Sequence, residues 1–203
     1  SEMCIRDRMQ TEERRLTVER NVPVDALYMA FHMCSRNHPD YYAFDMLSDL
    51  LSSGRSSRFV QHLVQDKQIF NSIDAYISGS IDNGLFHIVG KPAPEKTLEE
   101  AEKAIWEELA LLTEGSIDEN ELEKVKNRYE SEQIFNNLNY LNVATNLAYF
   151  ELIGKAEDIN TEVEKYRSVT QEQIKRAAKQ TFLPENCSVL YYKAAAKGAS
   201  HTP

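Results

Sequence analysis

Apolar side chains occupy every second position between residues 26 and 34, with smaller or polar residues between them. The apolar set is Leu27, Met29, Phe31 and Met33. A period of two places alternate side chains on opposite faces of a strand, so this run predicts a strand with one buried face. Similar runs predict further strands over residues 15–22, 73–78, 85–89 and 187–192. A chain with this pattern has to form a sheet and cover one face of it.

Helix signals occupy most of the remaining chain. Pro39 suits a first helical turn, and apolar residues recur at helical spacing until Ser52, Ser53 and Gly54 end the helix. Capping boxes, in which a serine or threonine precedes a glutamate or glutamine by three residues, predict three more helix starts. These pairs are Thr97 with Glu100, Ser116 with Glu119, and Thr170 with Gln173. The order of elements predicts an α+β domain whose largely antiparallel sheet has helices packed on one face.

Glycine and asparagine residues mark the ends of several elements. Asp82, Asn83 and Gly84 lie between two predicted strands and are expected to form a hairpin turn with positive φ. An asparagine-rich break near residues 136–137 separates two helical runs, the second of which is expected to end at Gly154.

Length and composition favour a single domain. The chain has 203 residues, 42% of them hydrophobic, which is enough for a sizeable core. Residues 1–8, SEMCIRDR, fit neither a strand nor a helix, and we interpret them as a non-native scar. Residues 9–193 form the predicted domain, and residues 194–203 are expected to be a disordered tail.

The charge of the chain restricts its partners. A formal net charge of −9 argues against nucleic acid and against an anionic membrane, because both would be repelled over most of the surface. No run approaches the roughly 20 apolar residues of a membrane span. One acidic cluster is expected to be the solvated face of a helix. It consists of Glu99, Glu100, Glu102, Glu107 and Glu108.

The sequence carries no recognisable metal or disulfide pattern. There is no CxxC spacing, so Cys34 and Cys187 are expected to be buried free thiols. His32, Cys34 and His38 come nearest to a ligand cluster. His38 lies beyond the end of the strand that carries the other two, whereas a catalytic zinc site needs three convergent ligands. We therefore predict neither a metal site nor a catalytic residue in this chain.

The segment SSGRSS, residues 52–57, joins two predicted helices, the second starting at Ser56 or Ser57. Serines and free amides at a helix start, with Arg55 and Arg58 nearby, could attract an anion. Corners of glycine and serine more often only end one helix and begin the next, and this is the expected role here.

Three longer stretches together resemble the carboxy-terminal domain of M16 zinc peptidases, the pitrilysin or insulinase-like family. They are HPDYYAFDMLSDLLSSGRSSRFVQHL, SIDENELEKVKNRY and SVTQEQIKRAAKQTFLPENCSVLYY. The resemblance covers about residues 13–193. It implies a protein of two or more similarly folded halves that enclose a peptide, with zinc held by an HxxEH motif in the amino-terminal half and a water activated there. This chain contains no HxxEH. Zinc is therefore expected in the missing amino-terminal half, and this chain by itself is predicted to be inactive.

The same resemblance implies that two catalytic helpers are not retained. After the corner, the family commonly carries an arginine and, seven residues later, a tyrosine, which help to hold the substrate or the developing oxyanion. Here these positions are Val64 and Asn71. Valine cannot donate a hydrogen bond, and asparagine lacks the reach of a phenol.

The resemblance leaves two functions open. The first is the non-zinc half of an M16-like metallopeptidase, which walls a peptide chamber while the amino-terminal half hydrolyses the peptide. The alternative is a non-catalytic structural or assembly subunit with the same fold. The expected partners are the missing amino-terminal half, peptide substrates, and a second M16-like chain that keeps the arginine and tyrosine.

Overall fold

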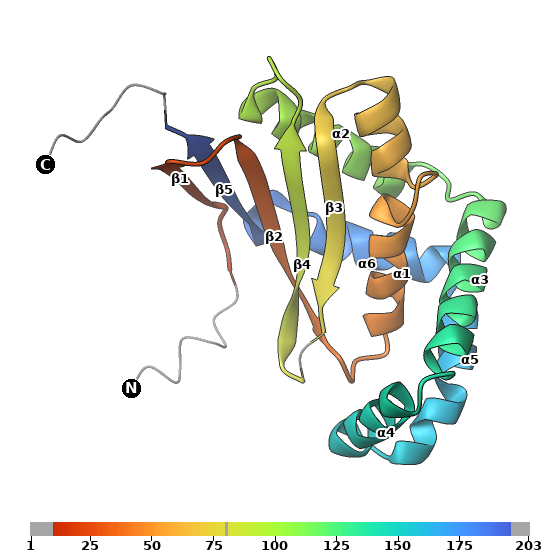
Figure 1. Cartoon of the computed structure of the whole chain (residues 1–203). Coiled ribbons are helices and arrows are strands. Elements are labelled where there is room, and N and C mark those ends of the chain that lie inside the picture. The colour runs from red at the N-terminus through yellow and green to blue at the C-terminus, as the bar shows by residue number, and fades with distance from the viewer. Residues whose placement is uncertain (1–9, 80, 196–203) are drawn as a thin grey trace, which may run out of the picture.

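A five-stranded sheet forms the centre of the structure, a computed structural model that describes residues 10–79 and 81–195. The strand order is β1–β5–β2–β4–β3 (Figure 1). β1 and β5 run parallel, and the other neighbours are antiparallel. The strands are β1 (Arg14–Arg20), β2 (Ala26–Ser35), β3 (Phe70–Ser78), β4 (Asn83–Pro92) and β5 (Cys187–Ala194). The predicted α+β class is confirmed.

Helices cover one face of this sheet. α1, α2 and α6 pack against the strands, while α3 and α5 lie outside α1, and α4 projects at one end (Figure 1). None of the described helices combines the length and apolar character needed to cross a bilayer. The helices are α1 (Tyr41–Ser52), the π-helix η2 (Phe59–Asp66), α2 (Leu98–Glu114), α3 (Glu119–Asn136), α4 (Tyr140–Ile153), the 3₁₀-helix η3 (Ala156–Thr161), α5 (Glu162–Arg167), α6 (Gln171–Thr181) and the 3₁₀-helix η4 (Pro184–Asn186).

The core lies between the sheet and its helices. Along β2, Leu27, Met29 and Phe31 are fully buried, whereas Tyr28 and His32 are exposed on the opposite face. This is the predicted alternation. Burying one large apolar side chain contributes about 1.5–3 kcal/mol, so the buried rows of the strands and helices dominate the stability of the fold.

Two of the three predicted capping boxes are present. The boxes led by Thr97 and Thr170 form as predicted. The prediction of a box led by Ser116 is wrong, because α3 begins after Asp118, which is its N-cap. The Asp118 carboxylate accepts a hydrogen bond from the backbone N–H of Asn120 at 3.2 Å. Aspartate caps as well as serine does, and its charge also favours the positive end of the helix dipole.

β3 and β4 form the predicted hairpin, but two of the three predicted turn residues lie in β4. Asn83 and Gly84 belong to β4, where Asn83 pairs with Ser35 of β2. Gly84 has no positive φ. A Cβ atom on Gly84 would lie 2.3 Å from the Ser78 carbonyl oxygen. Glycine is therefore required by the close approach of the two strands and not by the turn.

The acidic cluster of α2 is only partly a solvated face, so that prediction is wrong for two residues. Glu102 is 7% exposed and Glu108 is fully buried. Glu102 accepts hydrogen bonds from Arg15 Nη1 at 2.7 Å and from the Tyr191 hydroxyl at 2.5 Å. Glu108 Oε1 lies 2.9 Å from His62 Nδ1. These partners come from β1, β5 and η2, far from α2 in the sequence, so the local pattern did not reveal them.

The carboxy-terminal strand extends slightly past the predicted domain limit. The Ala194 N–H donates to Asp25 Oδ1 at 2.7 Å, and the Ala195 N–H donates to the Arg20 carbonyl at 2.8 Å. Ala194 therefore belongs to the sheet. Residues 1–8, interpreted from the sequence as a scar, and residues 196–203 of the expected tail 194–203 lie outside the described residues.

Candidate functional site

The corner between α1 and η2 is built from backbone and serine contacts. Gly54 has a φ of +87°, which favours glycine, and the Ser57 hydroxyl donates to the Gly54 carbonyl at 2.8 Å. Arg58 donates through Nε and Nη2 to the two carboxylate oxygens of Glu121 on α3, both at 2.9 Å. The hydrogen bond to Glu121 raises the pKa of Arg58. Arg58 is thus committed to a partner in the fold, and the corner joins η2 to α3.

The helix after the corner carries Val64. The Lys67 N–H donates to the His62 carbonyl at 3.0 Å, five residues back, which widens this segment into a π-helix. Val64 is half-buried and packs against the core. Its side chain contributes packing and offers no hydrogen-bond donor.

Asn71 lies at an irregular point of an edge strand. β3 forms one edge of the sheet, and its pairing with β4 shifts between Phe70 and Ser72, so Asn71 falls outside the register. Its side chain is exposed and makes no hydrogen bond within the described part of the chain. η2 and β3 pack against each other, which places Val64 and Asn71 on adjacent elements.

His32, Cys34 and His38 do not form a ligand set. His32 is exposed on β2, Cys34 is half-buried near the end of that strand, and His38 lies in the following turn. There His38 Nδ1 accepts a hydrogen bond from the Asp40 N–H at 3.1 Å. Burial, together with the charge of Asp40, raises the pKa of Cys34 to about 11. In the part of the chain that the structure describes, no group of three or more His, Cys, Asp or Glu side chains could hold a metal ion.

The face of the sheet opposite the helices is open and partly apolar; we call it the open face. Across β1, β5, β2 and β4, the register places Leu16, Leu190, Tyr28 and Val89 in one row. A groove of about 430 Å³ lies along this row, with Arg14 also lining it. Leu16 is 59% exposed and Tyr28 is 40% exposed. Among the described residues no helix covers this face (Figure 1).

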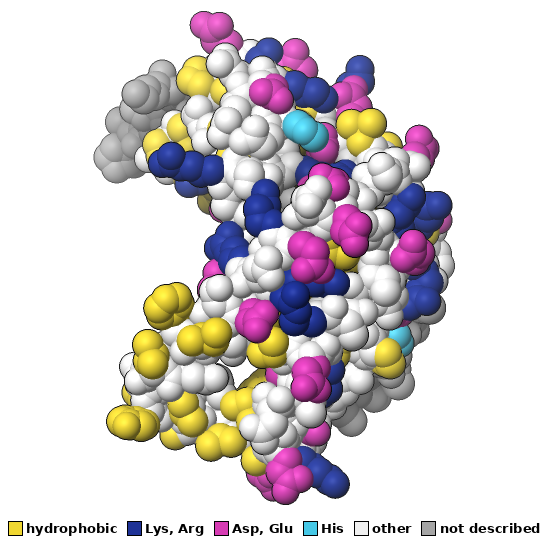
Figure 2. All heavy atoms as spheres, turned by 90° about the vertical axis from the view of Figure 1, so that its right-hand side faces the viewer, with side chains coloured by type: hydrophobic (Ala, Val, Ile, Leu, Met, Phe, Trp, Pro, Cys, Tyr) yellow, Lys and Arg dark blue, Asp and Glu magenta, His cyan; other side chains and the backbone are white. Residues whose placement is uncertain are grey.

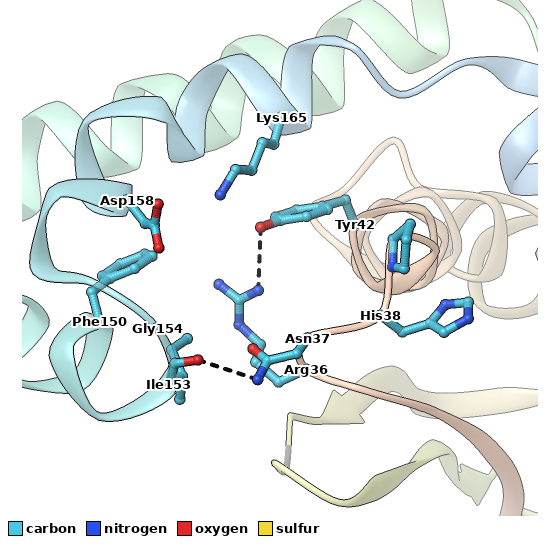
Figure 3. A pocket seen from close by; sticks show the side chains of 10 residues that line it. Arg36, Asn37, His38, Tyr42, Phe150, Ile153, Gly154, Asp158 and Lys165 are labelled. Carbon is cyan, nitrogen blue, oxygen red and sulfur yellow. Dashed lines mark hydrogen bonds between the residues drawn. The ribbon is translucent and has the colours of Figure 1, made fainter.

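A polar cleft of about 260 Å³ lies between the β2–α1 loop and the segment from α4 to α5. Figure 3 shows Arg36 from the loop and Lys165 from α5 directed into it. Arg36 Nη2 donates to Glu162 Oε1 at 2.5 Å, and the Tyr42 hydroxyl donates to Glu162 Oε2 at 3.1 Å. Lys165 Nζ lies 3.9 Å from the same carboxylate, and Asp158 lines the cleft. Glu162 on α5 thus binds Arg36 of the β2–α1 loop and Tyr42 of α1, and these contacts attach α5 to both segments.

α1 carries two half-buried carboxylates, Asp45 and Asp49, and the first of them contacts α5. The Tyr166 hydroxyl donates a hydrogen bond to Asp45, and burial raises the pKa of Asp45. Burial also raises the pKa of Asp49 to about 6. The sequence analysis did not single out these two carboxylates. The available signal was a pair of aspartates four residues apart on a helix that is otherwise largely apolar.

Comparisons with known proteins point to a single family. Residues 6–129 match the model of the family described as the peptidase M16 inactive domain. The "uncharacterized zinc protease YmxG" of Bacillus subtilis (strain 168) is 25% identical over 170 residues, which cover 83% of this chain and 41% of that protein.

Solved structures share the fold. A protease from Helicobacter pylori matches with a TM-score of 0.86 at 22% identity, covering 92% of this chain and 45% of that one. A chain of complex III2 from Candida albicans, Inz-5 bound, matches with a TM-score of 0.71 at 18% identity, covering 91% of this chain and 46% of that one. This chain thus spans less than half the length of each of these three proteins. Since the family match extends over more than half of its residues, the chain belongs to the peptidase M16 inactive domain family.

Proposed function

We propose that this domain is the non-zinc half of an M16-like metallopeptidase and forms a wall of its peptide chamber. The proposal rests on the open face, whose groove of about 430 Å³ offers apolar surface to the side chains of a peptide. Two comparisons support it: the match to an inactive peptidase domain, and the relative named as a zinc protease. In this proposal the chain is part of a longer protein, which we call the parent protein. The rest of the parent protein hydrolyses the peptide.

The residues of this chain do not fit a zinc centre. The sequence lacks HxxEH, and within the described residues His32 and Cys34 have no third ligand beside them. Zinc therefore belongs to the missing amino-terminal half in this proposal. The domain contributes binding and enclosure, which exclude water from the peptide and strengthen the polar contacts made in the chamber.

The test uses the full-length parent protein and two matched substitutions. Tyr28→Glu puts a charge into the groove, and Leu111→Glu puts the same charge on an exposed residue of α2. We expect Tyr28→Glu to lower kcat/KM for peptide hydrolysis about tenfold or more, mainly through KM, whereas Leu111→Glu should change it less than about twofold. Zinc content and melting temperature should stay unchanged in both. If Tyr28→Glu has no larger effect than its control, the open face does not contact the substrate.

We further propose that a second M16-like chain completes the site. Val64 and Asn71 cannot supply the contacts of an arginine and a tyrosine, and losing one such donor lowers the rate by a factor of about a hundred to a thousand. The second chain would carry both residues in the equivalent register. Co-expression of the parent with such a chain should produce a complex with higher peptidase activity, and that gain should disappear when the partner's arginine and tyrosine are replaced. Full activity of the parent alone would contradict this proposal.

A second candidate function is a structural subunit without peptidase activity. The likeness to a chain of complex III2, together with the loss of the family's arginine and tyrosine at Val64 and Asn71, favours it. Elemental analysis of the full-length parent separates the two functions. Stoichiometric zinc with peptide hydrolysis supports the peptidase, whereas a parent protein that lacks both is the structural subunit.

A further inference from the structure

Exposed apolar side chains gather at the end of α3 and along α4. Figure 2 shows hydrophobic side chains concentrated at this end of the molecule. Eight of the fifteen exposed large hydrophobic residues of the described chain lie here, with exposures from 37% to 90%. We call them the α3–α4 patch. It consists of Ile134, Phe135, Leu138, Tyr140, Leu141, Leu147, Tyr149 and Leu152.

The same segment is nearly free of charge. Residues 134–153 contain one charged side chain, Glu151, in a chain of which 27% is charged. Solvated helices normally carry charged residues on their outer face. Permanent protein–protein interfaces differ from such solvated faces, because apolar residues are enriched and charged residues are depleted at their centre. The α3–α4 patch therefore has the composition of a permanent interface.

α4 contacts the rest of the domain mainly at its carboxy-terminal end, and only one of its residues is buried. Phe150 is its one buried residue. The helix packs on η3, and the Asn37 side-chain amide donates to the Ile153 carbonyl at 3.2 Å, which fixes the end of α4 to the β2–α1 loop. At its start, the Asn139 side chain accepts a hydrogen bond from the Leu141 N–H at 2.9 Å. The apolar surface is thus presented in a defined geometry.

The patch is large enough for a stable contact. At about 100 Å² for each of its side chains, it exposes roughly 800 Å², which is one side of a standard protein–protein interface. The largest apolar patch on a typical monomer is smaller, about 300–600 Å².

We propose that the α3–α4 patch is the surface on which the amino-terminal half of the parent protein docks. This inference rests on the proposed function. The lengths of the relatives leave room for such a half. More than half of the length of YmxG and of the Helicobacter pylori protease lies outside the region that this chain matches. A half joined through the same polypeptide has a high effective concentration and stays in contact, as a charge-free interface of this size requires. A second copy is less suitable, because two chains that each carry a net charge of −9 repel each other.

Cysteine labelling tests the proposal without measuring activity. Leu141→Cys is introduced into the 203-residue chain and into the full-length parent, each with Cys4→Ser. Burial raises the pKa of Cys34 to about 11 and that of Cys187 to about 12, so both native thiols react slowly with a maleimide at pH 7. The control is Leu111→Cys, at a residue of α2 that is 58% exposed. The parent without an added cysteine provides the background.

We expect Leu141→Cys to react rapidly in the 203-residue chain and about a hundredfold more slowly in the parent, whereas Leu111→Cys should react equally in both. Equal labelling of Leu141→Cys in both proteins would overturn the proposal. So would protection that rises with the concentration of the isolated chain, which identifies a second copy, or protection of the parent only when another M16-like chain is added. None of these results depends on peptide hydrolysis, so the chamber-wall proposal can stand or fail separately.

Discussion

Replacing Glu162 with alanine would leave the two cations of the polar cleft without their shared carboxylate. Arg36 and Glu162 are 7% and 6% exposed, so water reaches little of either group. Removing one partner of a buried ion pair costs about 3–5 kcal/mol, because the remaining charge stays buried and uncompensated. We therefore expect Glu162→Ala to lower the free energy of unfolding by about 3–5 kcal/mol.

The reverse change should cost less. In Arg36→Met, Glu162 keeps the hydrogen bond from Tyr42 at 3.1 Å and the ammonium of Lys165 at 3.9 Å. We expect a loss of about 1–3 kcal/mol, the range for an impaired buried hydrogen bond. The double variant Arg36→Met/Glu162→Leu replaces the pair with apolar groups and should return to within about 1 kcal/mol of the wild-type protein.

Urea unfolding of the 203-residue chain at pH 7, followed by the fluorescence of its single tryptophan, measures all three variants. The slope with urea should be the same for each, so that midpoints can be compared. The argument fails if Glu162→Ala loses less than Arg36→Met, or if the double variant loses the sum of the two single changes.

Three further perturbations test the core, the carboxylates and the sheet. Leu47→Ala, at a fully buried position of α1, should cost about 2–5 kcal/mol in the same assay, and a loss below about 1 kcal/mol would contradict its central position. Burial raises the folded-state pKa of Asp49 from 3.8 to about 6, so Asp49 does not lower the free energy of unfolding below pH 3.8, and its ionisation lowers it as the pH rises through 6. Asp49→Asn should therefore raise the free energy of unfolding by about 1–3 kcal/mol above pH 6 and leave it unchanged near pH 3.5. An equal gain in the exposed control Asp66→Asn would show that the effect does not come from the burial of Asp49. Gly90→Ala would place a Cβ atom 2.4 Å from Phe70 Cε1 and should cost about 1–3 kcal/mol, part of which Phe70→Leu should restore; an unchanged midpoint would contradict this close contact.

Local patterns predicted most of the fold. The alternation along β2 and the capping boxes at Thr97 and Thr170 depend on residues that are close in sequence, so they could be recognised without tertiary information. The burial of Glu102 could not be recognised in this way. Its partners Arg15 and Tyr191 lie 87 and 89 residues away, and only the assembled sheet brings them to α2.

The same distinction applies to the candidate site. The corner at Gly54 and the apolar character of Val64 were visible in the sequence, and the structure shows how each is used in packing. The polar cleft was not visible, because Arg36 and Glu162 are separated by 126 residues and neither belongs to a motif. The open face was predicted only as the second face of alternating strands, and its groove depends on the order of strands in the sheet.

The position of β5 has a consequence for synthesis on the ribosome. β5 lies between β1 and β2, although it is the last of the described strands to be made. β2 ends at Ser35 and β5 begins at Cys187, so residues 36–186 are translated before β2 can receive this neighbour. At about 5–20 residues per second, that interval lasts roughly 8–30 s. During this time one edge of β2 has unpaired backbone groups and can pair with other nascent chains. A chain that stops before Cys187 keeps this edge open permanently, so premature termination within the domain should produce an aggregating product and not a smaller folded domain.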